Sequence, residues 1–350
     1  MIEIRRGNIL KTDAEALVNT VNCVGFMGKG IALQFKQAFP ENFESYQKAC
    51  HAKKVHPGRM FVYTTGSMLN PKYIINFPTK RHWRGSSRYE DIESGLQALI
   101  AEVRRLGIQT IAVPPLGCGL GGLDWSRVRE MIETAFKQLP EARVLLFEPT
   151  GTPEAKDMPV RTLRPHLTVA RALFIKLMDQ YTTMQYRLTL LEIQKLAYFL
   201  QEAGQPLRLK FAAGHYGPYA PNLNKVLETL EGHFIRGYGA TQKPDVELEL
   251  LAGSAEEADN FLTGKTPEHE RLERVSRLIE GFETPYVMEL LSSVHWLATH
   301  AKPPARDGAA AVQKMADWNE RKRRMFQPKH IQVAWERLAE EKWLLTATRV

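Results

Sequence analysis

The sequence has 350 residues, of which 44% are hydrophobic and 25% are charged, so it is long enough for two globular domains. It contains no run of the ~20 apolar residues that a membrane helix needs, and its first residues lack the apolar region of a secretory signal. Cys23, Cys50 and Cys118 have no metal-site spacing, which indicates a reducing cytoplasm without structural disulfides or a bound metal. The net charge of +8 favours phosphate-rich partners such as nucleic acid.

Short β-type runs alternate with helical runs through the first 150 residues. The predicted strands are Ile2–Arg5, Ala16–Val21, Met60–Thr65, Tyr73–Phe77, Thr110–Val113 and Arg143–Phe147. The predicted helices are Gly30–Phe39, Asn42–Lys54, Tyr89–Leu106 and Trp125–Leu139. This alternation predicts an α/β domain over residues 1–150, with a mostly parallel sheet covered by helices.

A proline-rich stretch without periodicity predicts a linker over residues 151–165. Residues 166–350 are predicted to form a second, mostly helical domain. Its predicted helices are Leu167–Thr182, Leu190–Gly204, Asn222–Leu230, Glu268–Gly281, Pro285–His300, Gly308–Arg324 and Lys329–Glu340. A terminal strand is expected over Trp343–Val350.

The segment from Val18 to Ala32 leaves a predicted strand, passes through glycines and opens a helix. Backbone N–H groups at such a helix start suit an anion. The amides of Asn19 and Asn22 offer both donors and acceptors for sugar hydroxyls. The alternative is a strand-to-helix turn whose glycines serve only its tight geometry.

The segment from Pro114 to Trp125 also lies between a predicted strand and a predicted helix. Its Gly117, Gly119 and Gly122 match G-x-G-x-x-G, so a Rossmann oxidoreductase has to be considered. Only one predicted strand remains before the linker, however, and a Rossmann sheet needs more strands downstream. Two phosphate-binding loops ~95 residues apart, each at the carboxyl end of a strand, predict one crevice for a diphosphate with sugars at both ends.

These segments occur in the order of a known pattern. Together with Gly7–Leu10, the two loops resemble the macrodomain family over the first 150 residues. The resemblance implies a mixed sheet flanked by helices, with ADP-ribose as the ligand and no cofactor. Many macrodomains carry aspartate where this chain has Asn8, so a charged contact to the adenine amino group is missing here.

The resemblance also implies where the ligand lies. Asn8 and Ile9 are expected near the adenine, Asn19 and Asn22 near the distal ribose, and residues 117–123 around the diphosphate. The residues expected to contact ADP-ribose are Asn8, Ile9, Asn19, Thr20, Asn22, Gly28, Gly30, Ile31, Ala32, Thr79, Leu116, Gly117, Cys118, Gly119, Leu120, Gly121, Gly122 and Leu123.

Lys80 is the candidate catalytic residue. It follows a predicted strand, at the same sheet edge as both glycine loops, and the Asn-Phe-Pro-Thr-Lys run resembles the terminal ADP-ribose glycohydrolase-like branch of macrodomains. That branch uses a lysine nucleophile, which implies that neutral Lys80 attacks the anomeric carbon of the distal ribose. Burial or the nearby Arg81 and Arg84 would lower its pKa. The branch has an aspartate where this chain has Gly121, and Asp124 lies three residues later.

The residues after Lys80 combine cations with aromatic rings. Arg81, His82, Trp83 and Arg84 suit single-stranded nucleic acid, with phosphates on the cations and a base on the ring. The alternative is a solvated loop that binds nothing.

The second domain carries two recognisable runs. Gln194–Phe199 and Tyr216–Pro221 resemble small helical domains that accompany antitoxins. The order of the two domains resembles the DarG-type antitoxins, whose partners are DarT-type toxins that attach ADP-ribose to thymine bases of single-stranded DNA. This resemblance implies an antitoxin whose first domain removes that ADP-ribose and whose second domain binds and inhibits the toxin.

The sequence is also compatible with two other functions. One is a non-catalytic ADP-ribose-binding module fused to a partner-binding or DNA-binding helical domain. The other is a DNA-binding repressor whose basic run Arg321–Arg324 contacts the duplex.

Overall fold

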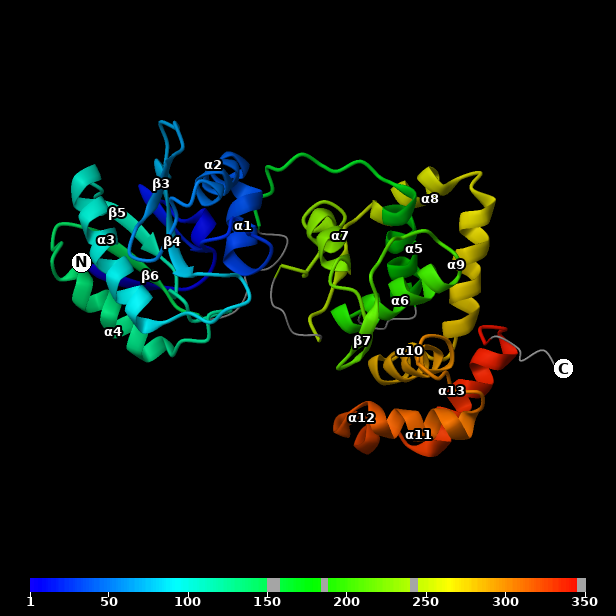
Figure 1. Cartoon of the computed structure of the whole chain (residues 1–350). Helices are drawn as coiled ribbons and strands as arrows, with labels where there is room; N and C mark the ends of the chain where they lie inside the picture. The colour runs from blue at the N-terminus through cyan, green and yellow to red at the C-terminus, as the bar shows by residue number, and fades with distance from the viewer. Residues whose placement is uncertain (150–157, 184–187, 240–244, 345–350) are drawn as a thin grey trace. The chain divides into compact units, whose positions relative to one another are not determined.

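The computed structural model describes residues 1–149, 158–183, 188–239 and 245–344. The chain divides into two compact units: the first comprises Met1–Arg164 together with Gly239, and the second comprises the other described residues from Pro165 onward. Figure 1 shows an α/β unit at the N-terminal end and a mostly helical unit at the C-terminal end. Most of the predicted linker, residues 151–157, lies outside the described residues, whereas Met158–Arg164 groups with the first unit.

The first unit is built on a six-stranded sheet in the order β1-β6-β5-β2-β4-β3. Only β3 and β4 pair antiparallel, and the other neighbours are parallel. The prediction of a mixed, mostly parallel sheet is therefore confirmed. The strands are β1 (Ile2–Arg5), β2 (Ala16–Asn22), β3 (Phe61–Thr64), β4 (Tyr73–Lys80), β5 (Thr110–Val113) and β6 (Arg143–Phe147).

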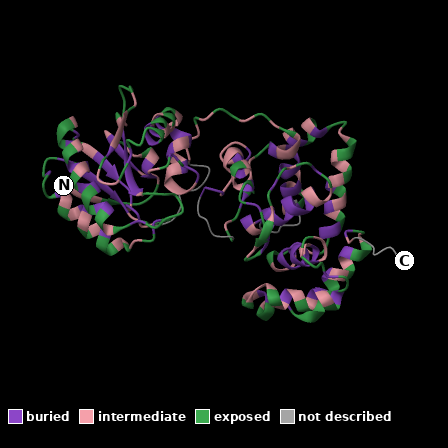
Figure 2. Ribbon diagram, viewed as in Figure 1, coloured by how far each residue is buried: buried purple, intermediate pink, exposed green. Residues whose placement is uncertain are grey.

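Helices cover both faces of this sheet, because side chains alternate along each strand. On β2, Leu17 packs in a cluster with Phe35, and its neighbour Val18 packs on the opposite face with Ile92 and Ile132. Figure 2 shows the inner strands β2, β4, β5 and β6 mostly buried between the helices, whereas the edge strands β1 and β3 are half-buried or exposed. The helices of the first unit are the 3-10 helix η1 (Ile9–Lys11), α1 (Gly30–Ala38), α2 (Pro40–His51), α3 (Tyr89–Leu106) and α4 (Trp125–Phe136).

Strand β4 continues beyond the predicted Tyr73–Phe77 and ends at Lys80. Its partner β3 pairs only with Tyr73–Asn76, so Pro78 lies where that side of β4 is unpaired. On its other side β4 pairs with β2 as far as Lys80, with a register shift between Val21 and Asn22. The strand thus carries Lys80 to the end of the sheet beside β2.

The second unit is mostly helical, as predicted, with two short antiparallel strand pairs. Within the described residues, no helix has the length and apolar character to cross a membrane. Its elements are α5 (Val169–Thr183), α6 (Leu190–Glu202), β7 (Ala212–Gly214), β8 (Gly217–Tyr219), α7 (Leu223–Leu230), β9 (Ile235–Arg236), β10 (Glu249–Leu250), α8 (Ser254–Leu262), α9 (Thr266–Ile279), α10 (Pro285–Thr299), α11 (Gly308–Trp318), α12 (Glu320–Met325) and α13 (Pro328–Glu340).

Some predicted elements of the second unit differ in the structure. The predicted helix Gly308–Arg324 is interrupted at Asn319, whose backbone is extended and whose side chain accepts the N–H of Lys322 to cap α12. Helix α8 was not predicted. Of the expected strand Trp343–Val350, residues 343 and 344 are not in a strand, and residues 345–350 lie outside the described residues.

Candidate active site

Three neighbouring parallel strands end at one edge of the sheet, and each carries a predicted site segment. Strand β2 leads into the first glycine loop, Cys23–Lys29, and β5 leads into the second, Pro114–Asp124. Strand β4 ends at Lys80. Because β5, β2 and β4 are adjacent in that order, their carboxyl ends meet where α/β folds bind ligands. The structure therefore brings together the segments that the sequence analysis assigned to one site.

Asn22 organises the first glycine loop. Its Oδ1 accepts the backbone N–H of Val24 at 3.0 Å and that of Phe26 at 3.3 Å, and its Nδ2 donates to the carbonyl of Phe26. The hydroxyl of Tyr46, in α2, donates to the carbonyl of Asn22. The amide predicted to hold a sugar hydroxyl is thus already engaged in holding the loop.

Asn19 lies beneath this edge, inside the sheet. Its side chain is fully buried, and its Nδ2 donates to Oδ1 of Asn76 at 3.0 Å. Asn76 in turn donates to Oδ1 of Asn42 at 2.7 Å. Among the described residues nothing hydrogen-bonds Oδ1 of Asn19. Asn19 therefore belongs to a buried amide network below the site, not to its accessible surface.

The second glycine loop folds back on itself through its own backbone. The N–H of Leu123 donates to the carbonyl of Gly117 at 3.1 Å, and the N–H of Gly122 donates to that of Gly119 at 3.1 Å. Gly117 has a φ of +72°, a conformation that glycine adopts without a steric penalty. No hydrogen bond within the described residues uses the N–H of Gly119, Leu120 or Gly121. These three donors are available to an anion.

Gly121 admits no side chain. A Cβ built there would lie 2.2 Å from the carbonyl oxygen of Gly117 and 2.3 Å from Oγ of Ser87. An aspartate at this position, which the resemblance to the glycohydrolase-like branch implies, is therefore excluded by the backbone. Asp124 does not replace it, because its carboxylate accepts the N–H of Arg127 at 3.0 Å and caps α4.

Lys80 reaches across from β4 to the second glycine loop. Its amine donates a hydrogen bond to the carbonyl of Leu120. A Cβ built on Gly30, at the start of α1, would lie 3.6 Å from Cδ1 of the same leucine. The amine of Lys80 therefore lies where the two glycine-loop segments approach each other.

Burial lowers the pKa of Lys80 below its usual value. Burial and neighbouring arginines were both predicted as causes of a lowered pKa, and the structure supports only burial. The guanidinium of Arg81 pairs with the buried carboxylate of Asp91 at 3.1 Å. A lowered pKa increases the fraction of neutral amine, which is the form of lysine that acts as a nucleophile.

The neighbouring thiols are poor nucleophiles. Burial raises the pKa of Cys23 to about 11 and that of Cys118 to about 12. Cys23 donates from its Sγ to the carbonyl of Lys80 at 3.3 Å. Since the thiolate is the reactive form, neither cysteine competes with Lys80 at neutral pH.

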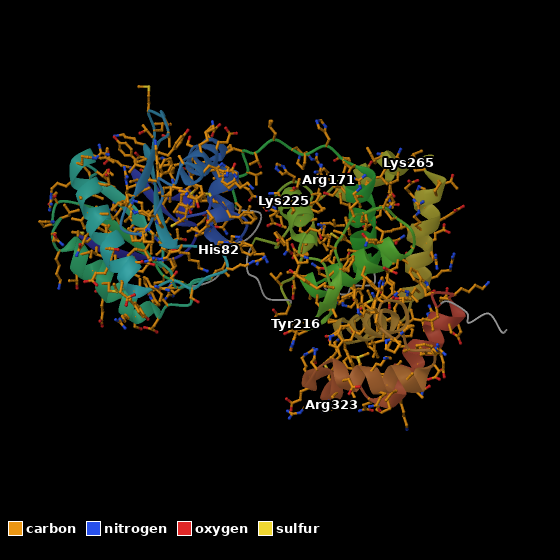
Figure 3. All side chains as sticks on the ribbon, viewed as in Figure 1. His82, Arg171, Tyr216, Lys225, Lys265 and Arg323 are labelled. Atoms are coloured by element: carbon orange, nitrogen blue, oxygen red, sulfur yellow. The ribbon has the colours of Figure 1, made fainter. Side chains whose placement is uncertain are left out.

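Aromatic rings line the rim beside Lys80. The ring of Trp83 stacks with those of Phe26 and His82, at centroid distances of 5.6 and 5.5 Å, and the guanidinium of Arg84 lies 4.5 Å from the centroid of Trp83. His82 is exposed on the first unit (Figure 3). Phe26 was not predicted as part of this rim, although a phenylalanine within a glycine loop could have indicated it. We call Phe26, His82, Trp83 and Arg84 the aromatic rim.

The predicted ligand residues differ widely in accessibility. The buried ones are Ile9, Asn19, Asn22, Gly28, Thr79, Leu116, Gly117 and Gly121. The half-buried ones are Asn8, Thr20, Gly30, Ile31, Ala32, Cys118 and Leu123, and the exposed ones are Gly119, Leu120 and Gly122. Backbone groups of the second loop are therefore more accessible than the asparagine side chains of β2.

The basic run of the second unit is largely engaged within the fold. Arg321 forms two hydrogen bonds with the carboxylate of Glu289, at 2.7 and 3.0 Å. Lys322 is fully buried and donates to Glu289 at 2.7 Å and to Ser293 at 2.9 Å. Arg324 pairs with Glu320. Because most of these cations are paired with other groups of the fold, few remain to bind phosphate at Arg321–Arg324.

Comparison with known proteins extends these observations. The Macro domain family matches residues 18–132. A DNA ADP-ribosyl glycohydrolase of Thermus aquaticus is 46% identical over 97% of this chain and 93% of its own length. A DNA ADP-ribosyl transferase–DNA ADP-ribosyl glycohydrolase fusion protein of Thermosipho africanus is 36% identical over 36% of this chain and 37% of its own length.

A solved structure, the macrodomain of Mycobacterium tuberculosis DarG, is 53% identical, covers 43% of this chain and 99% of its own, and gives a TM-score of 0.43. The alignment with the Thermus relative spans both units of this chain and nearly the whole length of the relative. The chain therefore belongs to the DarG family of macrodomain-containing DNA ADP-ribosyl glycohydrolases.

Proposed function

We propose that the protein is an antitoxin that removes ADP-ribose from thymine bases of single-stranded DNA, with Lys80 as the nucleophile. The observation that carries this proposal is the contact of the Lys80 amine with the second glycine loop, at the point where the first loop approaches it. Membership of the DarG family supports the substrate class. The free N–H groups of the second loop support binding of the diphosphate next to the amine.

In the proposed reaction, the neutral amine of Lys80 attacks the anomeric carbon of the distal ribose. A carbon–nitrogen bond forms to Lys80, and the glycosidic bond to the thymine base breaks. The base leaves with the electron pair of that bond and takes up the proton that the Lys80 nitrogen loses. Water then attacks the same carbon, the carbon–nitrogen bond to Lys80 breaks, and a proton of the water passes to that nitrogen, so ADP-ribose is released and the lysine returns as a neutral amine.

The aromatic rim supports a nucleobase as the leaving group. Phe26 and Trp83 are partly exposed rings on two different loops, and they lie near the end of β4 that carries Lys80. Flat rings beside cations bind single-stranded nucleic acid through stacking and phosphate contacts. We infer that the rim holds the modified base and its neighbours while the second loop holds the diphosphate.

The deciding experiment compares wild-type protein with Lys80→Ala and Lys80→Arg on single-stranded DNA that carries ADP-ribose on thymine, with protein-linked ADP-ribose in parallel. Both variants are expected to lose turnover and to retain ADP-ribose binding, because arginine stays charged and is no nucleophile. Full activity of Lys80→Ala would refute the lysine mechanism. Tight ADP-ribose binding by wild-type protein without turnover would favour the non-catalytic binding module.

We further propose that residues 166–350 bind and inhibit a DarT-type toxin. The match to the Thermus relative spans this region, and the Thermosipho relative joins transferase and glycohydrolase in one chain. Full-length Lys80→Ala separates inhibition from reversal, since it cannot remove ADP-ribose. It is expected to suppress DNA modification by the toxin in a purified assay. Unabated modification in its presence would refute toxin binding as a mode of neutralisation.

A further inference from the structure

The segment Met158–Arg164, which we call the strap, packs on the first unit. Its first residue contacts Asn8, whose Nδ2 donates to the thioether sulfur of Met158 at 3.4 Å. Its middle is held by the N–H of Arg161, which donates to the carbonyl of Gln37 at 2.7 Å. The guanidinium of Arg161 lies 5.7 Å from the ring centroid of Phe39. The strap is thus anchored at two separate points of the same unit.

The orientation of the Asn8 amide is set by the fold. Its Oδ1 accepts the N–H of Leu10 at 2.9 Å and caps the 3-10 helix η1. Since the oxygen is turned toward the helix, the Nδ2 faces the strap. Asn8 and Met158 are both half-buried, so each side chain has some exposure to solvent.

The strap lies outside what the family match covers. The Macro domain match ends at residue 132, and the last strand of the sheet ends at Phe147. Met158 nevertheless contacts Asn8, the residue that the resemblance to macrodomains places near the adenine of ADP-ribose. A residue beyond the matched domain therefore borders the position expected for the adenine.

We propose that Met158 is a specificity-determining residue of the adenine subsite, an inference that rests on the proposed function. A thioether is a weak hydrogen-bond acceptor, and a purine ring nitrogen is a stronger one, so the base takes over the amide of Asn8. The displaced sulfur stays beside the base and packs on its ring, as methionine sulfur does on aromatic groups. The strap thereby supplies one wall of the subsite.

The test uses the full chain with Met158→Ala. The dissociation constant for ADP-ribose, measured by calorimetry, is expected to rise about two- to tenfold, the range of a sulfur–aromatic contact. The KM on ADP-ribosylated single-stranded DNA should rise by a similar factor, with kcat unchanged, because Met158 does not touch the reacting carbon. Met158→Leu keeps an apolar side chain of similar size and is expected to recover most of the affinity. This variant also allows the test to be made if the alanine variant folds poorly.

Two control variants are matched to this change. Met68→Ala removes a methionine side chain that is 97% exposed, and Leu163→Ala removes an exposed apolar side chain of the strap itself. Neither is expected to alter ADP-ribose binding. If wild-type protein binds ADP-ribose and Met158→Ala binds it equally well or more tightly, this inference is overturned alone. A wild-type protein that does not bind ADP-ribose would overturn the proposed function as well.

Discussion

Replacing Gly121 with alanine tests the geometry of the second glycine loop directly. The new Cβ would lie 2.2 Å from the carbonyl oxygen of Gly117, and backbone cannot swing aside as a side chain can. The loop must open, which strains it by about 1–3 kcal/mol and breaks two hydrogen bonds of about 1 kcal/mol each. Those bonds run from Ser87 N–H to Gly121 and from Leu123 N–H to Gly117. The sum is about 3–5 kcal/mol.

This change should be visible in both stability and binding. A loss of about 3 kcal/mol lowers the melting temperature of a domain of this size by about 6–12 °C. Loss of the preformed loop should weaken ADP-ribose binding at least about tenfold. Gly119→Ala is the matched control for stability, because a Cβ there meets nothing within 4 Å. An equal fall in melting temperature for the two variants, or an unchanged melting temperature for Gly121→Ala, would refute the reasoning.

Three further predictions concern Lys80, Lys195 and the aromatic rim. Because burial lowers the pKa of Lys80 and only its neutral amine attacks, kcat should fall as the pH drops below that pKa; a pH-independent kcat between pH 6 and 9 would contradict this. Lys195 is fully buried, donates to the carbonyl of Pro218 at 2.8 Å and has its pKa lowered to about 7 by burial. The unfolded chain then binds more protons at this residue than the folded one between about pH 7 and the ordinary lysine pKa. The free energy of unfolding should therefore gain up to ~1.4 kcal/mol per pH unit from Lys195, and Lys195→Met should reduce the slope measured in denaturant titrations. Trp83→Ala and Phe26→Ala should each raise KM for modified DNA about fivefold or more, with the dissociation constant of free ADP-ribose unchanged; an equal loss for both ligands would argue against base stacking.

Much of the first unit was predictable because its signals are local. The β-type runs, the helical periodicity and the glycines that interrupt them predicted the strands, the helices and both loops. Helix ends were less predictable. Periodicity alone predicts one helix over Gly308–Arg324, whereas Asn319 caps a second helix within that range. The placement of Lys80 at the carboxyl end of a strand was also visible, although the extent of β4 was not.

What each side chain does at the site depended on the tertiary structure. The α/β fold and the segments that share one sheet edge were predictable from the residue pattern, because alternating strands and helices impose a parallel topology. The residue pattern did not determine that Asn19 is buried in an amide network, that Gly121 admits no Cβ, or that Met158 reaches Asn8. Those outcomes arise from close packing between residues distant in the chain, and such contacts leave no periodic trace in the sequence.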